Sequence, residues 1–191
     1  MALLKTTRAS ALFVGTVLLV AGTAEARVLM TQDQALQLAF PPPQTVERRT
    51  LYLDEAQAAR AAREAGAPVE VRVVPYYVGS QEGRVTGYAY FDTHLVRTLP
   101  ETILVRLRPD GAIAAIDIVA FDEPDEYRTT PRWLQQFQGQ GGAGSGDLGT
   151  KIRSLSGATL SARAVTEAAK RIVTLHRLYV AAPAGGKPST R

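Results

Sequence analysis

The stretch Ser156-Gly157-Ala158-Thr159-Leu160-Ser161 is followed by a long helical pattern from Ala162 to Tyr179. The predicted fold is organised around this turn and helix. Gly157 allows a positive φ angle or a close approach of the backbone to a ligand. Thr159 places a hydroxyl where the first amide groups of a helix have no partner, and those amides and the helix dipole favour a phosphate group. Ser161 is expected to act as the N-cap of this helix.

The helical pattern itself has two faces. Apolar residues recur at a spacing of three and four and are expected to be buried: Val165, Ala168, Ala169, Ile172, Leu175 and Tyr179. Charged residues lie between them and are expected to face solvent: Arg163, Glu167, Lys170, Arg171 and Arg177. One interpretation of the preceding motif is therefore an ordinary helix start, and the other is a phosphate site.

The motif resembles that of the FMN-binding domain family, which includes the C subunit of the sodium-pumping NADH:quinone reductase and the G subunit of the Rnf electron-transport complex. The family has Ser/Thr-Gly-Ala-Thr followed, one residue on, by Thr or Ser, and here Ser156 to Thr159 and Ser161 match. In that family the motif threonine carries FMN through a phosphodiester bond. A magnesium-dependent flavin transferase makes this bond outside the cytoplasm from FAD. The resemblance therefore implies covalent FMN on Thr159.

The resemblance covers roughly the C-terminal half of the chain, from a strand-turn-strand unit at 102–121 through the loop and helix at 122–137. It implies that cofactor-binding residues surround Thr159, namely Ser156, Gly157, Ala158, Leu160 and Ser161. It also implies that Glu123, in a Glu-Pro element, shapes the wall of the flavin pocket. The family usually has an acid three positions before the motif serine, where this chain has Arg153. An arginine there can pair with the FMN phosphate.

Three further side chains are candidates for the site. Trp133 shares a helical face with Leu134 and Phe137 and can pack in the core or flank the isoalloxazine ring. His94 and Arg97 are expected in a loop between two strands, where binding groups often collect. We predict that Arg97 contacts the phosphate or ribityl chain of the flavin. With only two histidines in the chain, a histidine-based metal site is not expected.

Composition excludes several classes of protein. The chain has 191 residues, enough for one domain or for one domain with an extension. It has no cysteine, so disulfides, thiolate metal sites and haem attachment are excluded. The formal charge of +4 is small, and the arginines are spread along the chain. Nucleic acid is therefore not an expected partner.

The N-terminus has the pattern of a secretory signal. Lys5 and Arg8 form a basic region, an apolar region follows from Ala9 to Gly22, and Ala24-Glu25-Ala26 matches a cleavage site. We predict a signal peptide at 1–26 and a mature periplasmic protein from Arg27. An uncleaved signal would leave the domain attached to the membrane on the same side.

The remaining pattern predicts an α+β fold like that of the FMN-binding domain, an antiparallel sheet with helices packed on one face. A capping box starts a helix over 31–39, and Asp54 caps an Ala-rich helix over 55–65 that is expected to pack on the sheet. Strands are expected at 46–53, 69–78, 84–91, 102–108 and 112–121, with a hairpin at Pro109-Asp110-Gly111.

The predicted organisation has four parts. A signal peptide covers 1–26, a helical and strand extension covers 27–66, the FMN-binding domain covers 67–180, and a disordered tail covers 181–191. The Gly-rich segment 138–149 is expected to be a linker or a lid.

Two functions remain open from the sequence. The first is a periplasmic flavoprotein electron carrier without catalysis of its own, matured by the flavin transferase and exchanging electrons with membrane or periplasmic redox proteins. The second is a non-redox binding or accessory domain whose Ser-Gly-Ala-Thr turn holds a phosphate or only starts a helix. A hydrolase using Ser156 or Thr159 lacks a base to activate the hydroxyl.

Overall fold

The computed structural model describes residues 28–142, 148 and 152–181. The predicted signal peptide, half of the Gly-rich segment (143–147 and 149) and the tail after 181 lie outside the described residues. The helices are α1 (Gln32–Ala39), α2 (Glu55–Ala65), α3 (Pro131–Leu134) and α4 (Thr159–Tyr179). The strands are β1 (Thr45–Tyr52), β2 (Val73–Gln81), β3 (Arg84–Leu95), β4 (Pro100–Leu107) and β5 (Ile113–Phe121). Short 3-10 helices follow at Asp125–Tyr127 and Gln135–Phe137.

The strands form one antiparallel sheet of five strands in the order β1-β2-β3-β4-β5, so each strand pairs with its neighbours in sequence. Glu82 and Gly83 both have positive φ angles, 52° and 76°, and make the tight β2–β3 turn. Gly111, with φ of 80°, makes the predicted hairpin between β4 and β5. The α+β fold is thus confirmed.

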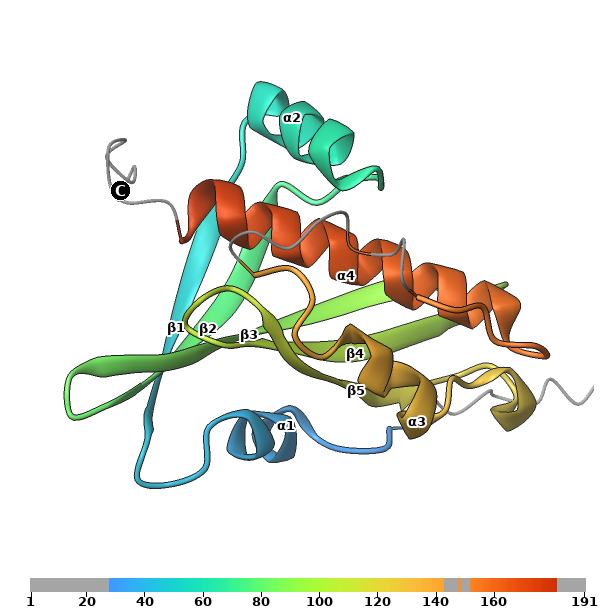
Figure 1. Ribbon diagram of the computed structural model, residues 1–191, viewed down its shortest axis with the longest axis horizontal. Helices are drawn as coiled ribbons and strands as arrows, with labels where there is room; N and C mark the ends of the chain where they lie inside the picture. The colour runs from blue at the N-terminus through green and yellow to red at the C-terminus, as the bar shows by residue number, and fades with distance from the viewer. Residues whose placement is uncertain (1–27, 143–147, 149–151, 182–191) are drawn as a thin grey trace, which may run out of the picture.

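Helices cover both faces of this sheet, so the prediction of a single covered face was wrong (Figure 1). The long helix α4 lies on one face, above a core that includes Tyr90 and Ile103. On the other face, α1 and the residue after it, Phe40, pack against Tyr77 and Leu104. Both faces are apolar because β2, β3 and β4 carry large apolar side chains at successive positions, which point to alternate sides.

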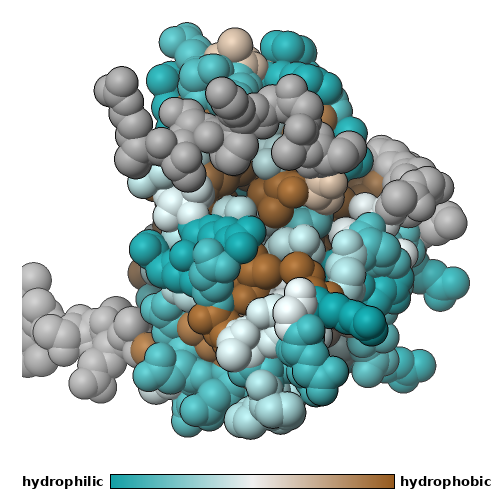
Figure 2. Space-filling model, turned by 90° about the vertical axis from the view of Figure 1, so that its left-hand side faces the viewer, coloured by the Kyte–Doolittle hydropathy of each residue, from teal (hydrophilic) through white to brown (hydrophobic). Residues whose placement is uncertain are grey.

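The Ala-rich helix α2 packs mainly on α4, and only Leu51 and Val74 of the sheet pack against the same cluster, so our prediction that it packs on the sheet was largely wrong (Figure 1). Ala58 and Ala61 are buried against Leu175, and the Tyr179 hydroxyl donates to the Gln57 carbonyl at 2.9 Å. Figure 2 views the end of the molecule with the β2–β3 turn and shows hydrophobic side chains between mainly hydrophilic groups above and below. None of the described helices is long and apolar enough to cross a lipid bilayer.

Gly79 makes room for Phe40 on the α1 face. Gly79 of β2 faces Gly87 of β3, and a Cβ atom at Gly79 would lie 2.2 Å from Cδ1 of Phe40. We therefore expect Gly79→Ala to destabilise the fold by about 1–3 kcal/mol, because the phenyl ring must move from a packed site. Urea denaturation of the variant and the wild type measures this difference.

The double variant Gly79→Ala/Phe40→Ala is the control for this contact. With the ring removed, the added methyl group should cost much less, because only the Thr86 hydroxyl oxygen, 2.9 Å from the added Cβ atom, still has to move. If Gly79→Ala is equally destabilising with and without the phenyl ring, the explanation by this contact is wrong.

Candidate functional site

The motif forms a tight turn directly before α4. Gly157 has φ of 86°, and a Cβ atom there would meet nothing within 4 Å, so backbone conformation rather than lack of space favours glycine. The helix begins at Thr159, and Ala158 occupies the N-cap position without a capping side chain. Ser161 lies inside the helix and its hydroxyl donates to the Tyr127 carbonyl, so its prediction as N-cap was wrong.

The first turn of α4 is therefore left with unpaired donors. The first backbone bond of the helix is donated by Ala162 to Ala158 at 2.9 Å, so the preceding amides have no acceptor among the described residues. The Thr159 hydroxyl donates to the Leu155 carbonyl at 3.2 Å and its side chain is exposed, as are Ser156 and Leu160. This end of the helix can hold an anion next to an accessible hydroxyl.

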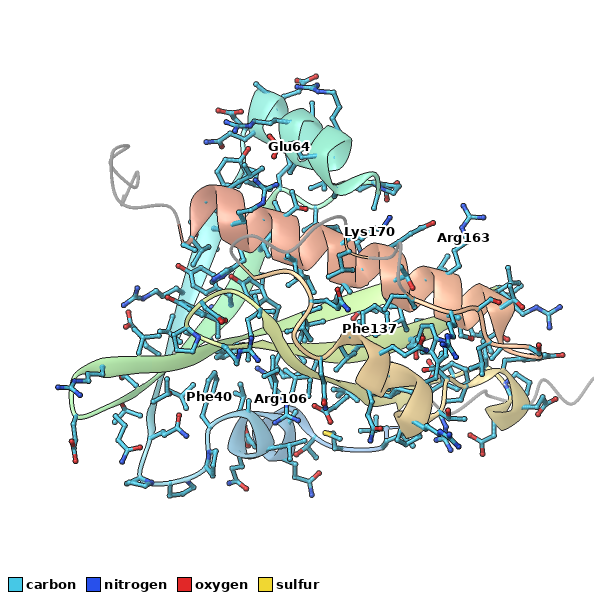
Figure 3. The ribbon with its side chains drawn as sticks, in the orientation of Figure 1. Phe40, Glu64, Arg106, Phe137, Arg163 and Lys170 are labelled. Atoms are coloured by element: carbon cyan, nitrogen blue, oxygen red, sulfur yellow. The ribbon has the colours of Figure 1, made fainter. Side chains whose placement is uncertain are left out.

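An open cleft of about 310 Å³ lies beside Thr159. One wall is a single face of α4, with Thr159, Arg163, Thr166 and Lys170. The opposite walls come from segment 152–154, Trp133, and Gly66 at the end of α2. Figure 3 shows Arg163 and Lys170 projecting from α4 on the side away from the sheet.

Trp133 joins the motif segment to the core. Its side chain is 5% exposed and lies edge-on to Phe137, with ring centroids 5.3 Å apart. Its indole N–H donates to the Arg153 carbonyl at 2.7 Å, and the Arg153 amide donates to Gln136 at 2.9 Å. These two bonds fix the backbone before the motif and leave the Arg153 side chain exposed at the cleft.

Basic side chains surround the cleft. Arg163 pairs with Glu167 at 2.8 Å, but both groups are partly solvated, so this ion pair is weak. Arg153 and Lys170 also line the cleft. The lining therefore has three basic groups and one acidic group, which suits a ligand with a phosphate.

Residues 99–174 match the family model described as the FMN-binding domain. Over these residues the chain resembles the FMN-binding domain family. The matched region includes the whole motif, Trp133, and the cleft residues of α4. No curated protein matches the chain.

The FMN-binding domain has the groups that its ligand requires. Unpaired amides at the start of α4 and the guanidinium of Arg153 suit a phosphate. The cleft, walled by an indole ring and by aliphatic stems, suits part of an aromatic ring system. The family match and this donor set together support a flavin-binding protein that takes FMN.

Glu123 and Arg97 lie near the start of α4 but do not line the cleft. The Glu123 carboxylate accepts hydrogen bonds from the backbone amides of Thr98 and Leu99 at 2.7 and 2.9 Å, and these hydrogen bonds lower the pKa of Glu123. The Arg97 guanidinium lies 4.7 Å from the ring centroid of Tyr127, whose carbonyl accepts the Ser161 hydroxyl. In this structure Glu123 holds the β3–β4 loop, and Arg97 contacts the segment that supports the helix.

His94 lies within β3 and not in a connecting loop, so that expectation was wrong. It contacts Asp92 at 2.9 Å and Glu101 at 3.1 Å, and none of the three lines the cleft. Arg171 was expected in solvent, but it makes a two-pronged contact to Asp92 at 2.8 and 3.1 Å. We call Asp92, His94, Glu101 and Arg171 the buried charge cluster.

This cluster sets the charge of His94. Burial favours neutral imidazole, but hydrogen bonds to Asp92 and Glu101, with their negative charge, raise the pKa of His94 to about 9. Burial would also raise the pKa of Asp92, but bonds from His94 and Arg171 lower it overall. The cluster therefore joins α4 to β3 and β4 through charged groups at neutral pH.

Sequence reasoning missed several residues of the cleft. Arg163 and Lys170 were expected only as solvated charges, and Thr166 and Gly66 were not considered. The spacing from Thr159 to Arg163, Thr166 and Lys170 follows one face of a helix, so this spacing could have identified the α4 wall. Gly66 comes from a distant part of the chain, and no sequence signal places it there.

Proposed function

We propose that the chain is a periplasmic electron carrier with FMN attached through a phosphodiester to Thr159. The observation that carries the proposal is the exposed Thr159 hydroxyl, which lies at an uncapped helix start beside a basic cleft within the FMN-binding domain. A covalent bond retains the cofactor where free FMN is scarce.

In the attachment reaction, the FMN group is transferred from FAD to Thr159. The Thr159 oxygen attacks the phosphorus of the FMN half of FAD, the bond between the two phosphates breaks, and AMP leaves. The hydroxyl proton passes to a base of the transferase, since no described side chain accepts a bond from this hydroxyl. The amides at the start of α4 stabilise the negative charge on the phosphodiester.

The chain's own residues would position the flavin. Trp133 and the α4 face offer surface to the ring, and Arg153 and Lys170 offer positive charge near the phosphate. Bound flavin supplies the redox chemistry. Electrons would enter and leave through redox proteins of the membrane or the periplasm, for which an exposed cleft leaves access.

The test is to express the full chain in a bacterial envelope with and without a flavin transferase. The proposal expects a mature chain that starts at Arg27 and, only with the transferase, gains the mass of one FMN less water. The denatured protein should then fluoresce on a gel under ultraviolet light. An unmodified mature chain in both cultures would reject covalent attachment and favour the phosphate-binding or purely structural turn.

A further inference from the structure

A second cavity of about 410 Å³ lies along the outer edge of β5. It is lined by both faces of this strand, by Leu29 and Met30, and by the segment that leads into and through α3. Trp133 of α3 lines the cleft of the motif, whereas Pro131 and Leu134 of the same helix line this cavity. The two cavities share no lining residue, so the second cavity is a separate feature.

The cavity coincides with a gap in the pairing of the sheet edge. At one end, the Val119 carbonyl accepts hydrogen bonds from the backbone amides of Leu29 and Met30 at 2.9 and 3.2 Å. At the other end, Ile113 exchanges bonds of 2.8 and 2.9 Å with Gln140 and Gly139. Among the described residues, no backbone group reaches the outer edge between these points. A ligand there can use free strand donors and acceptors, but it must be short because both ends are occupied.

The charged groups in the wall are predominantly basic. Arg106 donates to Asp117 at 2.9 Å and to the Leu38 carbonyl at 3.3 Å. A guanidinium has five N–H donors, so Arg106 keeps donors beyond these two bonds. Arg128 adds a second guanidinium, 3.5 Å from the solvated Asp125. Figure 3 shows Arg106 on the α1 side of the sheet. Two guanidinium groups and one carboxylate in the lining favour an anion.

The rest of the wall is largely apolar, with Leu29, Met30, Ile116, Ile118 and Leu134. An apolar wall with convergent donors is typical of a small-molecule site. We propose that this cavity binds a small carboxylic acid with an apolar chain or ring, its carboxylate on Arg106 and Arg128 and its apolar part against α3 and Met30. The same chemistry is present in a free acid and in the C-terminal residue of a peptide.

Calorimetric titration of the Thr159→Ala chain tests the site without flavin. The probes are hexanoate, the uncharged hexanamide, and two short peptides that end in leucine, one with a free carboxylate and one amidated. The proposal expects saturable binding of hexanoate or of the free peptide, at least about tenfold tighter than of the matched uncharged probe. Binding of the peptide alone would assign the carboxylate to a partner protein's C-terminus.

Three variants locate the binding. Arg128→Gln, the charge-neutral pair Arg106→Gln/Asp117→Asn, and the filling substitution Ala115→Met should each weaken binding about tenfold or more. Arg60→Gln on the surface of α2 is the control and should change nothing. Circular dichroism identifies any variant that fails to fold, and Arg128→Gln, at a partly exposed side chain, keeps the test decisive. No saturable binding, equal binding of charged and uncharged probes, or unaltered binding in folded variants would overturn the proposal.

Discussion

Replacing Thr159 with alanine is expected to abolish covalent flavin entirely, because the hydroxyl oxygen is the bridging atom of the proposed ester. The chain should still fold, since the side chain is exposed and makes one weak bond, to the Leu155 carbonyl at 3.2 Å. The measurement is the mass and gel fluorescence of protein made with the transferase. Covalent flavin on Thr159→Ala at the wild-type level would place the attachment elsewhere.

Two comparisons support this experiment. Thr159→Ser keeps a hydroxyl at the same place and should retain part of the modification. The sequence contains one tryptophan, Trp133, which lines the same cleft, so its emission should be lower in the flavin-bearing chain than in Thr159→Ala. Equal tryptophan emission in the two proteins would argue against a flavin ring near this cleft.

Stability is expected to fall by about 3 kcal/mol between pH 6.5 and 9.5 through the titration of His94. Its pKa is raised from 6.5 to about 9 in the folded protein, so protonated His94 favours folding. That contribution is fully present below pH 6.5, the unfolded value, and is lost as the pH rises through about 9. Urea denaturation at a series of pH values measures it.

His94→Gln should remove this alkaline decline and lower stability near pH 6.5, because Glu101 is 0% exposed and loses its charged partner. His176→Gln is the matched control. Burial lowers the pKa of His176 to about 4, so it is neutral throughout this range and should not affect the slope. Persistence of the full alkaline decline in His94→Gln would disprove the role of the buried charge cluster.

Local sequence signals predicted the elements well. The capping box at Thr31, the N-cap at Asp54, the Asp-Gly turn and the strands appear as expected, because short-range chemistry determines each of them. The packing of α2 on α4 was not predictable in this way. A small-residue face fits closely on a helix or on a sheet, and only tertiary structure selects between them.

The candidate site divides in a similar way. The motif turn and its helix could be predicted from the sequence, because the turn depends on Gly157 and the helix on the spacing of the apolar residues that follow. The location of His94 was not, because β3 continues to Leu95 by pairing with β4, and its partners Asp92 and Glu101 have no recognisable spacing as a set. The partial burial of Arg171 likewise depends on a carboxylate 79 positions away.

The two margins of the sheet have a further consequence. Along β1, the exposed charges of Glu47, Arg48 and Arg49 oppose the addition of a strand from another molecule. Along β5, residues 29–30 and 139–140 already bond to the ends of the margin. At high concentration, copies of this domain therefore have little opportunity to aggregate by pairing their edge strands.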